Sequence, residues 1–190
     1  MIPELMRLYY PRIAIQAARM NAFSPIIATS SPKHTAFLKS LGATHVLDRN
    51  LSPEAILSEI TKITVDIPLQ YVYDAVSDKT TQCMAYDALA SGGGLVSVFP
   101  NSEALLADRV REGDGKRVVR PFSSLRLPAN HALGLEVYKR MTGWLEDGTI
   151  VVSVLFQTKD RHGTDDDEYS RIESRYSLTG CWVSFLGLRG

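Results

Sequence analysis

The stretch IIATSSPKH, Ile26 to His34, decides the fold class. Its first six residues are β-branched or small, which predicts a short buried strand that ends in hydroxyl side chains. Ser31 and Pro32 then predict a helix start, because serine is a favoured N-cap and proline is well tolerated at the first helical position. A strand is therefore followed directly by a helix.

The same alternation continues along the chain. Further strands are predicted at residues 45–48, 71–76, 95–99 and 118–122, and helices at residues 32–41, 53–63, 79–89 and 129–146. Strands that alternate with helices across short connections predict a parallel sheet with helices on both faces. The predicted fold class is thus α/β, a doubly wound parallel sheet.

Composition excludes several classes of protein. Among 190 residues, 21 Lys and Arg balance 21 Asp and Glu, so no long-range attraction to nucleic acid is expected. No run approaches the roughly 20 apolar residues of a membrane span, and the N-terminus lacks a signal-peptide pattern. Cys83 and Cys181 form no metal-binding cluster. We expect a cytoplasmic protein without a metal, a nucleic-acid partner or a membrane.

Two other patterns fit structural roles better than chemical ones. Gly92 to Gly94 follow a helix and precede a strand, the reverse of the order in a phosphate-binding loop, so a tight turn is predicted. The run TDDDE, Thr164 to Glu168, lacks calcium-loop spacing and lies in a polar segment, so solvated charges are expected there.

Ligands of doubly wound sheets collect at the carboxyl ends of the strands. The candidate site therefore comprises the polar residues that close each predicted strand, at residues 29–33, 48–50, 74–77 and 99–101.

The opening stretch has two interpretations. Ser30, Ser31 and Lys33 offer hydroxyls and a cation without an acid, and the following helix would favour an anion, which is the chemistry that suits the 2′-phosphate of NADP(H). The same residues also fit an ordinary capped helix start with Lys33 in solvent. Local sequence leaves both interpretations open.

Three longer segments, taken together, carry a family resemblance. PRIAIQAARMNAFSPIIATSSPKHTAFLKSLGATHVLDRN, YVYDAVSDKTTQ and YDALASGGGLVSVFP resemble the cofactor domain of medium-chain dehydrogenase/reductases, in the zinc-free, GroES-like branch of fungal enoyl and quinone reductases. The resemblance covers residues 11–151 and implies a Rossmann-like NADP(H)-binding domain. It also implies hydride transfer to an activated C=C or carbonyl of a small-molecule substrate.

The resemblance assigns roles to matching positions. It places Ser30, Ser31 and Lys33 at the 2′-phosphate. It also places the end of the third strand at the adenine and the end of the fourth strand at the nicotinamide, through residues Asp74, Ala75, Val76, Ser77, Val98, Phe99 and Pro100. It further implies a homodimer through the sheet edge near Val118 to Phe122.

The departures from the family concern both ends. Residues 1–10 stand where the family has its first strand and glycine-rich turn, and residues 152–190 read as a divergent, partly disordered tail. Loss of the first strand, which is central in this fold, predicts a gap or an exposed edge in the middle of the sheet. Three hypotheses follow: a shortened oxidoreductase that retains its cofactor half, an inactive remnant that binds nucleotide weakly or serves in dimer contacts, or a chain that does not fold stably alone because its sheet is incomplete.

Overall fold

The computed structural model describes residues 2–65, 67–98, 106, 114–121, 124, 127–151 and 182–185, with backbone alone for residues 2–10 and 182–185. The chain divides into two compact units, one formed by Met1–Pro121 with Leu178–Gly190 and the other by Phe122–Ser177. The second unit contains α6 (Pro128–Glu146), which confirms the predicted long helix.

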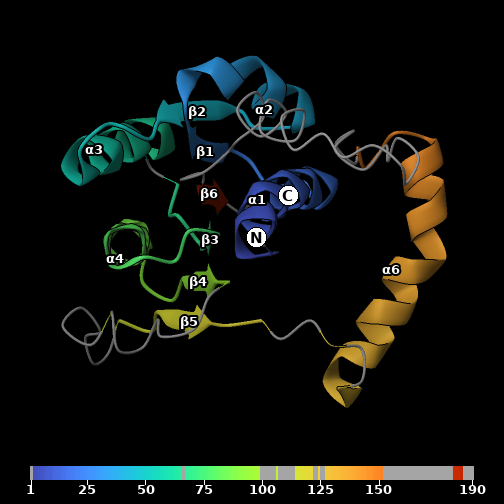
Figure 1. The fold of residues 1–190 in the computed structure, drawn as a ribbon. Coiled ribbons are helices and arrows are strands. Elements are labelled where there is room, and N and C mark those ends of the chain that lie inside the picture. Colours follow the sequence, from blue (N-terminus) through green and yellow to red (C-terminus); the bar gives the residue numbers. More distant parts are fainter. Residues whose placement is uncertain are drawn as a thin grey trace. The chain divides into compact units, whose positions relative to one another are not determined.

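The first unit alternates helices and strands (Figure 1). Its elements are α1 (Ile2–Met20), β1 (Ile26–Ser30), η1 (Pro32–His34), α2 (Thr35–Leu41), β2 (His45–Asp48), α3 (Pro53–Thr64), β3 (Tyr71–Asp74), α4 (Lys79–Ala88), β4 (Gly94–Ser97), β5 (Arg117–Val119) and β6 (Trp182–Phe185). The predicted strands are therefore present, although the fifth covers residues 117–119 rather than 118–122.

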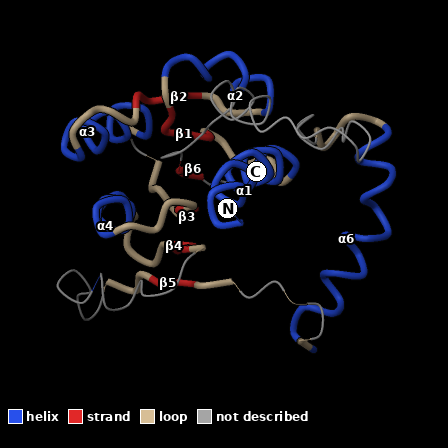
Figure 2. The backbone as a smooth tube through the Cα atoms, in the orientation of Figure 1, coloured by secondary structure: helices blue, strands red, loops and turns tan. Residues whose placement is uncertain are grey.

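These strands form one sheet in the order β2-β1-β6-β3-β4-β5 (Figure 2). The pairs β1–β2, β3–β4 and β4–β5 are parallel, whereas β6 is antiparallel to both of its neighbours. The order is that of a Rossmann sheet, 3-2-1-4-5-6, with β6 in the position of the first strand. The predicted α/β class and Rossmann-like topology are confirmed.

The predicted gap in the middle of the sheet is wrong. β6 fills it, pairing Ser184 with Ile27 on one side and with Val72 on the other. Without this strand, backbone N–H and C=O groups of β1 and β3 would face each other unpaired, at a cost comparable to several lost hydrogen bonds. Residues 182–185, which lie in the predicted tail, therefore belong to the sheet.

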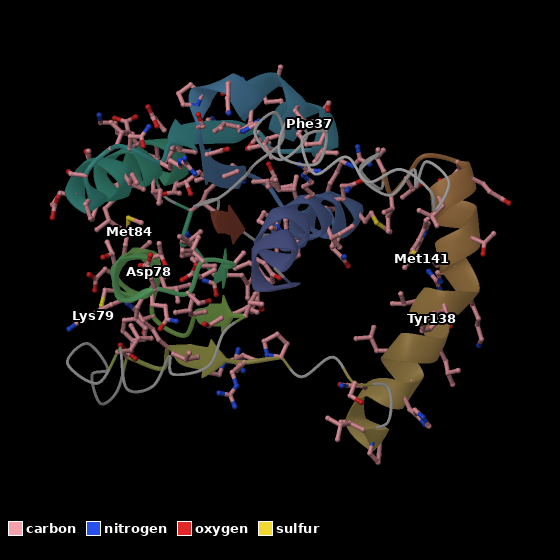
Figure 3. All side chains as sticks on the ribbon, viewed as in Figure 1. Phe37, Asp78, Lys79, Met84, Tyr138 and Met141 are labelled. Carbon is pink, nitrogen blue, oxygen red and sulfur yellow. The ribbon has the colours of Figure 1, made fainter. Side chains whose placement is uncertain are left out.

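Helices cover both faces of this sheet, as the apolar strands require. On one face, residues of α3 and α4 pack on Ile27, Val72 and Leu95; Met84 of α4 is labelled in Figure 3. On the other face, α1 and α2 pack on Ile26 and Ala28. Since side chains alternate along β1, Thr29 faces α3 and α4, and Ser30 faces α1 and α2.

The local sequence signals act as expected. Ser52 caps α3 by accepting from the backbone N–H of Ala55 at 3.2 Å, and Asp78 caps α4 by accepting from that of Thr81 at 2.8 Å. Gly92 adopts a φ of 77° in the turn between α4 and β4. That turn is structural, because Gly92 donates its N–H to the carbonyl of Asp114 rather than facing a ligand.

Candidate functional site: the carboxyl edge of the sheet

The first part of the site is the junction of β1 and β2. The two strands run in parallel register with Ser30 opposite Asp48, and the backbone N–H of Arg49 donates to the carbonyl oxygen of Ser30 at 3.1 Å. This bond holds the turn after β2 against the turn after β1. Arg49 thereby starts from the same edge as Ser31 and Lys33, within the range of residues 48–50 that the sequence placed in the candidate site.

The turn after β1 differs from the predicted capped helix. Ser31 has extended backbone angles, φ −64° and ψ 138°, but its side chain makes no capping hydrogen bond. The helix begins as the short 3₁₀ turn η1 and continues as the seven-residue α2, so its dipole is that of a short helix. Side chains, rather than the helix start, must therefore supply any attraction for an anion here.

The charges at this junction are mixed. Lys33 is exposed and Arg49 is half-buried, so two cations lie at neighbouring strand ends. Asp48 contributes one negative charge, and its Oδ1 accepts the backbone N–H of Asn50 at 2.9 Å. The formal sum of these three side chains is one positive charge, which suits a phosphate that can also accept hydrogen bonds from serine.

Ser30 lies deeper than its neighbours. Its side chain is 1% exposed, and within the described residues its Oγ has no hydrogen-bond partner. A buried hydroxyl without a partner costs stability, so its retention fits either a polar contact outside the described residues or a ligand. The predicted role of Ser30 at a 2′-phosphate stays a prediction.

The second part of the site is the turn after β3, built around Asp74. This carboxylate is fully buried, and its Oδ1 accepts the backbone N–H groups of Val76 and Ser77 at 2.9 Å each. Its Oδ2 accepts the hydroxyl of Thr81 at 2.8 Å. Burial raises the pKa of Asp74 despite these hydrogen bonds, which act in the opposite direction. Both carboxylate oxygens are thus used to shape the turn.

Ser77 links this turn to β4. It has a φ of 56°, an uncommon conformation for a residue with a Cβ, and its Oγ donates to the carbonyl oxygen of Asp74 at 2.9 Å. Ser97 Oγ donates to Ser77 Oγ at 3.0 Å, and Gln82 Nε2 donates to Ser97 Oγ at 3.2 Å. Gln82 also donates to the Ser77 carbonyl at 3.0 Å. The network fixes the ends of β3 and β4 relative to each other.

The remaining predicted residues follow these strands. Ala75 is buried and Val76 is half-buried within the Asp74 turn. The backbone N–H of Val98 donates to the carbonyl oxygen of Asp74 at 3.2 Å, which brings the end of β4 to the same edge. Phe99 and Pro100 lie outside the described residues. The structure therefore brings the turn that contains Asp74 and the residue Val98 together. Residues 30–33 lie at the end of β1, on the other side of β6.

The third part is the position of the family's glycine-rich turn, which would hold a pyrophosphate. In this chain β6 begins there, because Trp182 pairs with Thr29 near the carboxyl end of β1. α1 packs beside it and is helical from Ile2 through Pro11 to Met20. An uninterrupted helix uses its N–H groups internally. Within the described residues, no glycine-rich turn therefore stands at the position where this fold holds a pyrophosphate.

The rest of the described structure offers less for a site. A hollow of about 360 Å³ beside α1 is mainly apolar and contains no charged side chain; its lining is Ile13, Ala14, Ala17, Ala18, Asn21, Phe23 and Tyr73. In the described part of the chain, no group of three or more His, Cys, Asp or Glu residues is placed to hold a metal ion. Among the same residues, no helix has the length and apolar character needed to cross a membrane.

The strand order and the site at its carboxyl edge define an α/β domain of the dinucleotide-binding type. A family model described as zinc-binding dehydrogenase matches residues 12–103. A trans-enoyl reductase (grgB) of Penicillium sp is 30% identical over 151 residues, which are 73% of this chain and 42% of that protein. The predicted resemblance is thereby confirmed: residues 12–103 are similar to the zinc-binding dehydrogenase family, and the longer match is to a trans-enoyl reductase.

Solved structures agree on the fold. The nucleotide-binding subdomain of the enoylreductase domain of PpsC from Mycobacterium tuberculosis superposes with a TM-score of 0.53 at 19% identity, covering 75% of this chain and 79% of that one. A mycobacterial protein solved with NADPH superposes with a TM-score of 0.52 at 20% identity, covering 67% of this chain and 39% of that one. The chain spans about two fifths of the length of the curated reductase and of the NADPH complex.

Proposed function

We propose that this chain supplies the NADP(H)-binding half of an oxidoreductase of the enoyl-reductase type. The proposal is supported by the family match and by similarity to a trans-enoyl reductase. The nicotinamide would supply the hydride, and an activated C=C or carbonyl of a small molecule would accept it. The part of the chain described here would bind and orient the cofactor.

One observation carries the cofactor assignment. Parallel pairing of β1 with β2, closed by the bond from Arg49 N–H to Ser30 C=O, places Lys33 and Arg49 at neighbouring strand ends beside Ser31. At this position of the fold, an acidic residue selects the free ribose hydroxyl of NAD, while basic residues select the 2′-phosphate of NADP. The acid that is present, Asp48, is engaged with the Asn50 backbone. Two cations beside a single acid that is already hydrogen-bonded favour NADP(H) over NAD(H).

Binding without catalysis is the second candidate function. It is favoured by the arrangement of α1 and β6, which occupies the place of the glycine-rich turn. In that case the chain would bind a nucleotide, or contact a second copy through the edge strand β5, without transferring hydride. A homodimer through β5 remains part of this proposal, because β5 ends the sheet.

Calorimetric titration of the purified chain with NADPH and with NADH tests the proposal. Lys33→Ala and Arg49→Ala should each weaken NADPH binding by about three- to tenfold, since a charge-assisted hydrogen bond to phosphate contributes on the order of 1 kcal/mol at a partly exposed site. Lys39→Ala is the matched control, because Lys39 lies in the last turn of α2, toward the other edge of the sheet. Equal losses for NADPH and NADH would remove both cations from the 2′-phosphate. Consumption of NADPH with an enoyl substrate separates the two candidates.

A further inference from the structure

We propose that this chain recognises the 2′-phosphorylated adenosine end of NADP(H) alone, so that the pyrophosphate and nicotinamide add little to affinity. This inference rests on the proposed function and names the ligand class of the same site as 2′-phosphorylated adenosine nucleotides. It follows from what stands at the centre of the carboxyl edge, where dinucleotide-binding domains hold the pyrophosphate.

The direction of β6 is the first argument. In this fold the central strand normally runs toward the carboxyl edge and continues into the glycine-rich turn, whose N–H groups point at the pyrophosphate. β6 runs the other way: Trp182 is level with Thr29 near the carboxyl edge, and Phe185 is level with Ile26 at the other end. The chain therefore enters the sheet at the place from which the turn would leave.

The length of α1 is the second argument. α1 and β1 run in opposite directions across a short turn, so the start of α1 points toward the carboxyl edge. From Ile26 to Ser30, β1 rises about 13 Å, which a helix covers in about nine residues. Counting back from Met20 reaches Pro11. The helix from Ile2 to Pro11 then continues about 14 Å past the edge of the sheet.

This extension changes which N–H groups are available. A helix leaves only its first four N–H groups without internal partners, and in α1 these belong to residues about 14 Å beyond the sheet. Level with the edge, Pro11 has no N–H at all, and the residues that follow it donate within the helix. Among the described residues, the backbone of α1 and β6 at this level therefore offers no anion-binding cradle.

Arg12 is the side chain that would have to replace this cradle. Arg12 follows Pro11 directly, but it is 3% exposed and its guanidinium lies 5.1 Å from the centre of the ring of Phe37 on α2. Figure 3 labels Phe37. A guanidinium packed in this way stabilises the contact between α1 and α2. By contrast, Lys33 lies in η1, directly after β1, and its side chain is exposed.

The test compares nucleotides with the full chain by calorimetry. The probes are 2′-AMP, 2′,5′-ADP, NADPH, NADH and 5′-AMP. The inference predicts that the three 2′-phosphorylated probes bind with dissociation constants within about threefold of one another, and that NADH and 5′-AMP bind at least about tenfold more weakly. Lys33→Ala should weaken the three by a common factor, and Lys39→Ala should leave all of them unchanged.

Each other result is decisive. NADPH binding more than about tenfold tighter than 2′-AMP would overturn the inference and leave the proposed function standing, and would assign Arg12 or residues outside the described part of the chain to the pyrophosphate. NADH binding as tightly as NADPH would overturn the inference as well. No saturable binding of NADPH or of any 2′-phosphorylated probe would overturn the proposed function itself.

Discussion

The backbone N–H of Arg49 donates to the carbonyl oxygen of Ser30 at 3.1 Å, and this bond joins the turns that follow β1 and β2. Because the two strands are parallel, both turns project from the same edge of the sheet. A lysine from one turn and an arginine from the other are thus held by the backbone rather than by a long flexible segment.

Asp48→Asn should tighten binding of NADPH by about two- to fivefold. The substitution removes a negative charge near the proposed phosphate position, a change worth on the order of 0.5–1 kcal/mol for a partly exposed group. It keeps an oxygen that can accept the N–H of Asn50, so the turn is preserved. Calorimetric titration at low and high salt measures the effect, which should shrink as salt rises. An unchanged dissociation constant at low salt would place the phosphate elsewhere.

Asp74 should make the stability of the domain fall with rising pH. Burial raises its pKa above the ordinary value of 3.8, so the folded state holds the proton more tightly than the unfolded state. The free energy of unfolding should therefore fall as pH rises from 3.8 through the raised pKa, and this contribution should be constant above it. Urea unfolding of the wild-type chain and of Asp74→Asn across this range isolates the contribution, because Asn does not titrate.

Two substitutions at Asp74, to Asn and to Ala, separate charge from hydrogen bonding. Asp74→Asn keeps an oxygen for the N–H groups of Val76 and Ser77 and an amide that can donate to Thr81, so its stability near neutral pH should equal or exceed that of the wild type. Asp74→Ala leaves those donors without their acceptor and should cost about 2–4 kcal/mol. Equal losses in the two variants would show that the turn requires the negative charge.

Ser184→Pro should unfold the sheet at its centre. Ser184 lies between Ile27 and Val72, so a proline there removes a backbone donor from a strand paired on both sides and costs about 3 kcal/mol or more. Ser184→Val keeps the N–H and favours extended backbone, so it should remain folded. Amide hydrogen exchange should show loss of protection in β1 and β3 for the proline variant alone. Protection that persists in the proline variant would mean that β6 does not complete the sheet.

A cluster at the opposite edge should affect stability without affecting nucleotide binding. The Tyr86 hydroxyl donates to Asp114 at 2.9 Å, and Lys116 Nζ donates to the Tyr86 carbonyl at 2.9 Å while lying 4.7 Å from the centre of its ring. Tyr86→Phe should cost about 1 kcal/mol, as expected for one hydrogen bond. Urea unfolding measures this loss, and an unchanged dissociation constant for NADPH serves as the control. Weaker binding of NADPH by Tyr86→Phe would show that this cluster affects the site.

Local signals predicted most of the fold because they act within a few residues. Ser52 and Asp78 cap their helices, and apolar runs form the parallel strands where the sequence places them. β6 could not be predicted in this way. The strand is only four residues long and has a glycine near each end. Its pairing joins residue 182 to residue 29, a contact that depends on the unfilled position in the sheet.

The site was predictable only in part, for the same reason. Ser31, Lys33 and Arg49 lie in ranges that the sequence predicted, because each range follows a recognisable strand, but only the register of β1 with β2 shows which of these residues are neighbours. Gln82 was not predicted, because its two bonds reach Ser77 and Ser97 across the ends of different strands. Asp74 to Ser77 were predicted to line an adenine, and that role remains untested beside their observed part in shaping the turn.

The ratio of the NADH and NADPH dissociation constants for the wild-type chain tests the central claim most directly. If Ser31, Lys33 and Arg49 bind the 2′-phosphate, calorimetry at low salt should give NADPH about ten- to a hundredfold the affinity of NADH, equivalent to about 1.4–2.7 kcal/mol. The difference should narrow as salt rises. A ratio near one, or the absence of saturable NADPH binding, would contradict the assignment of this edge of the sheet to NADP(H).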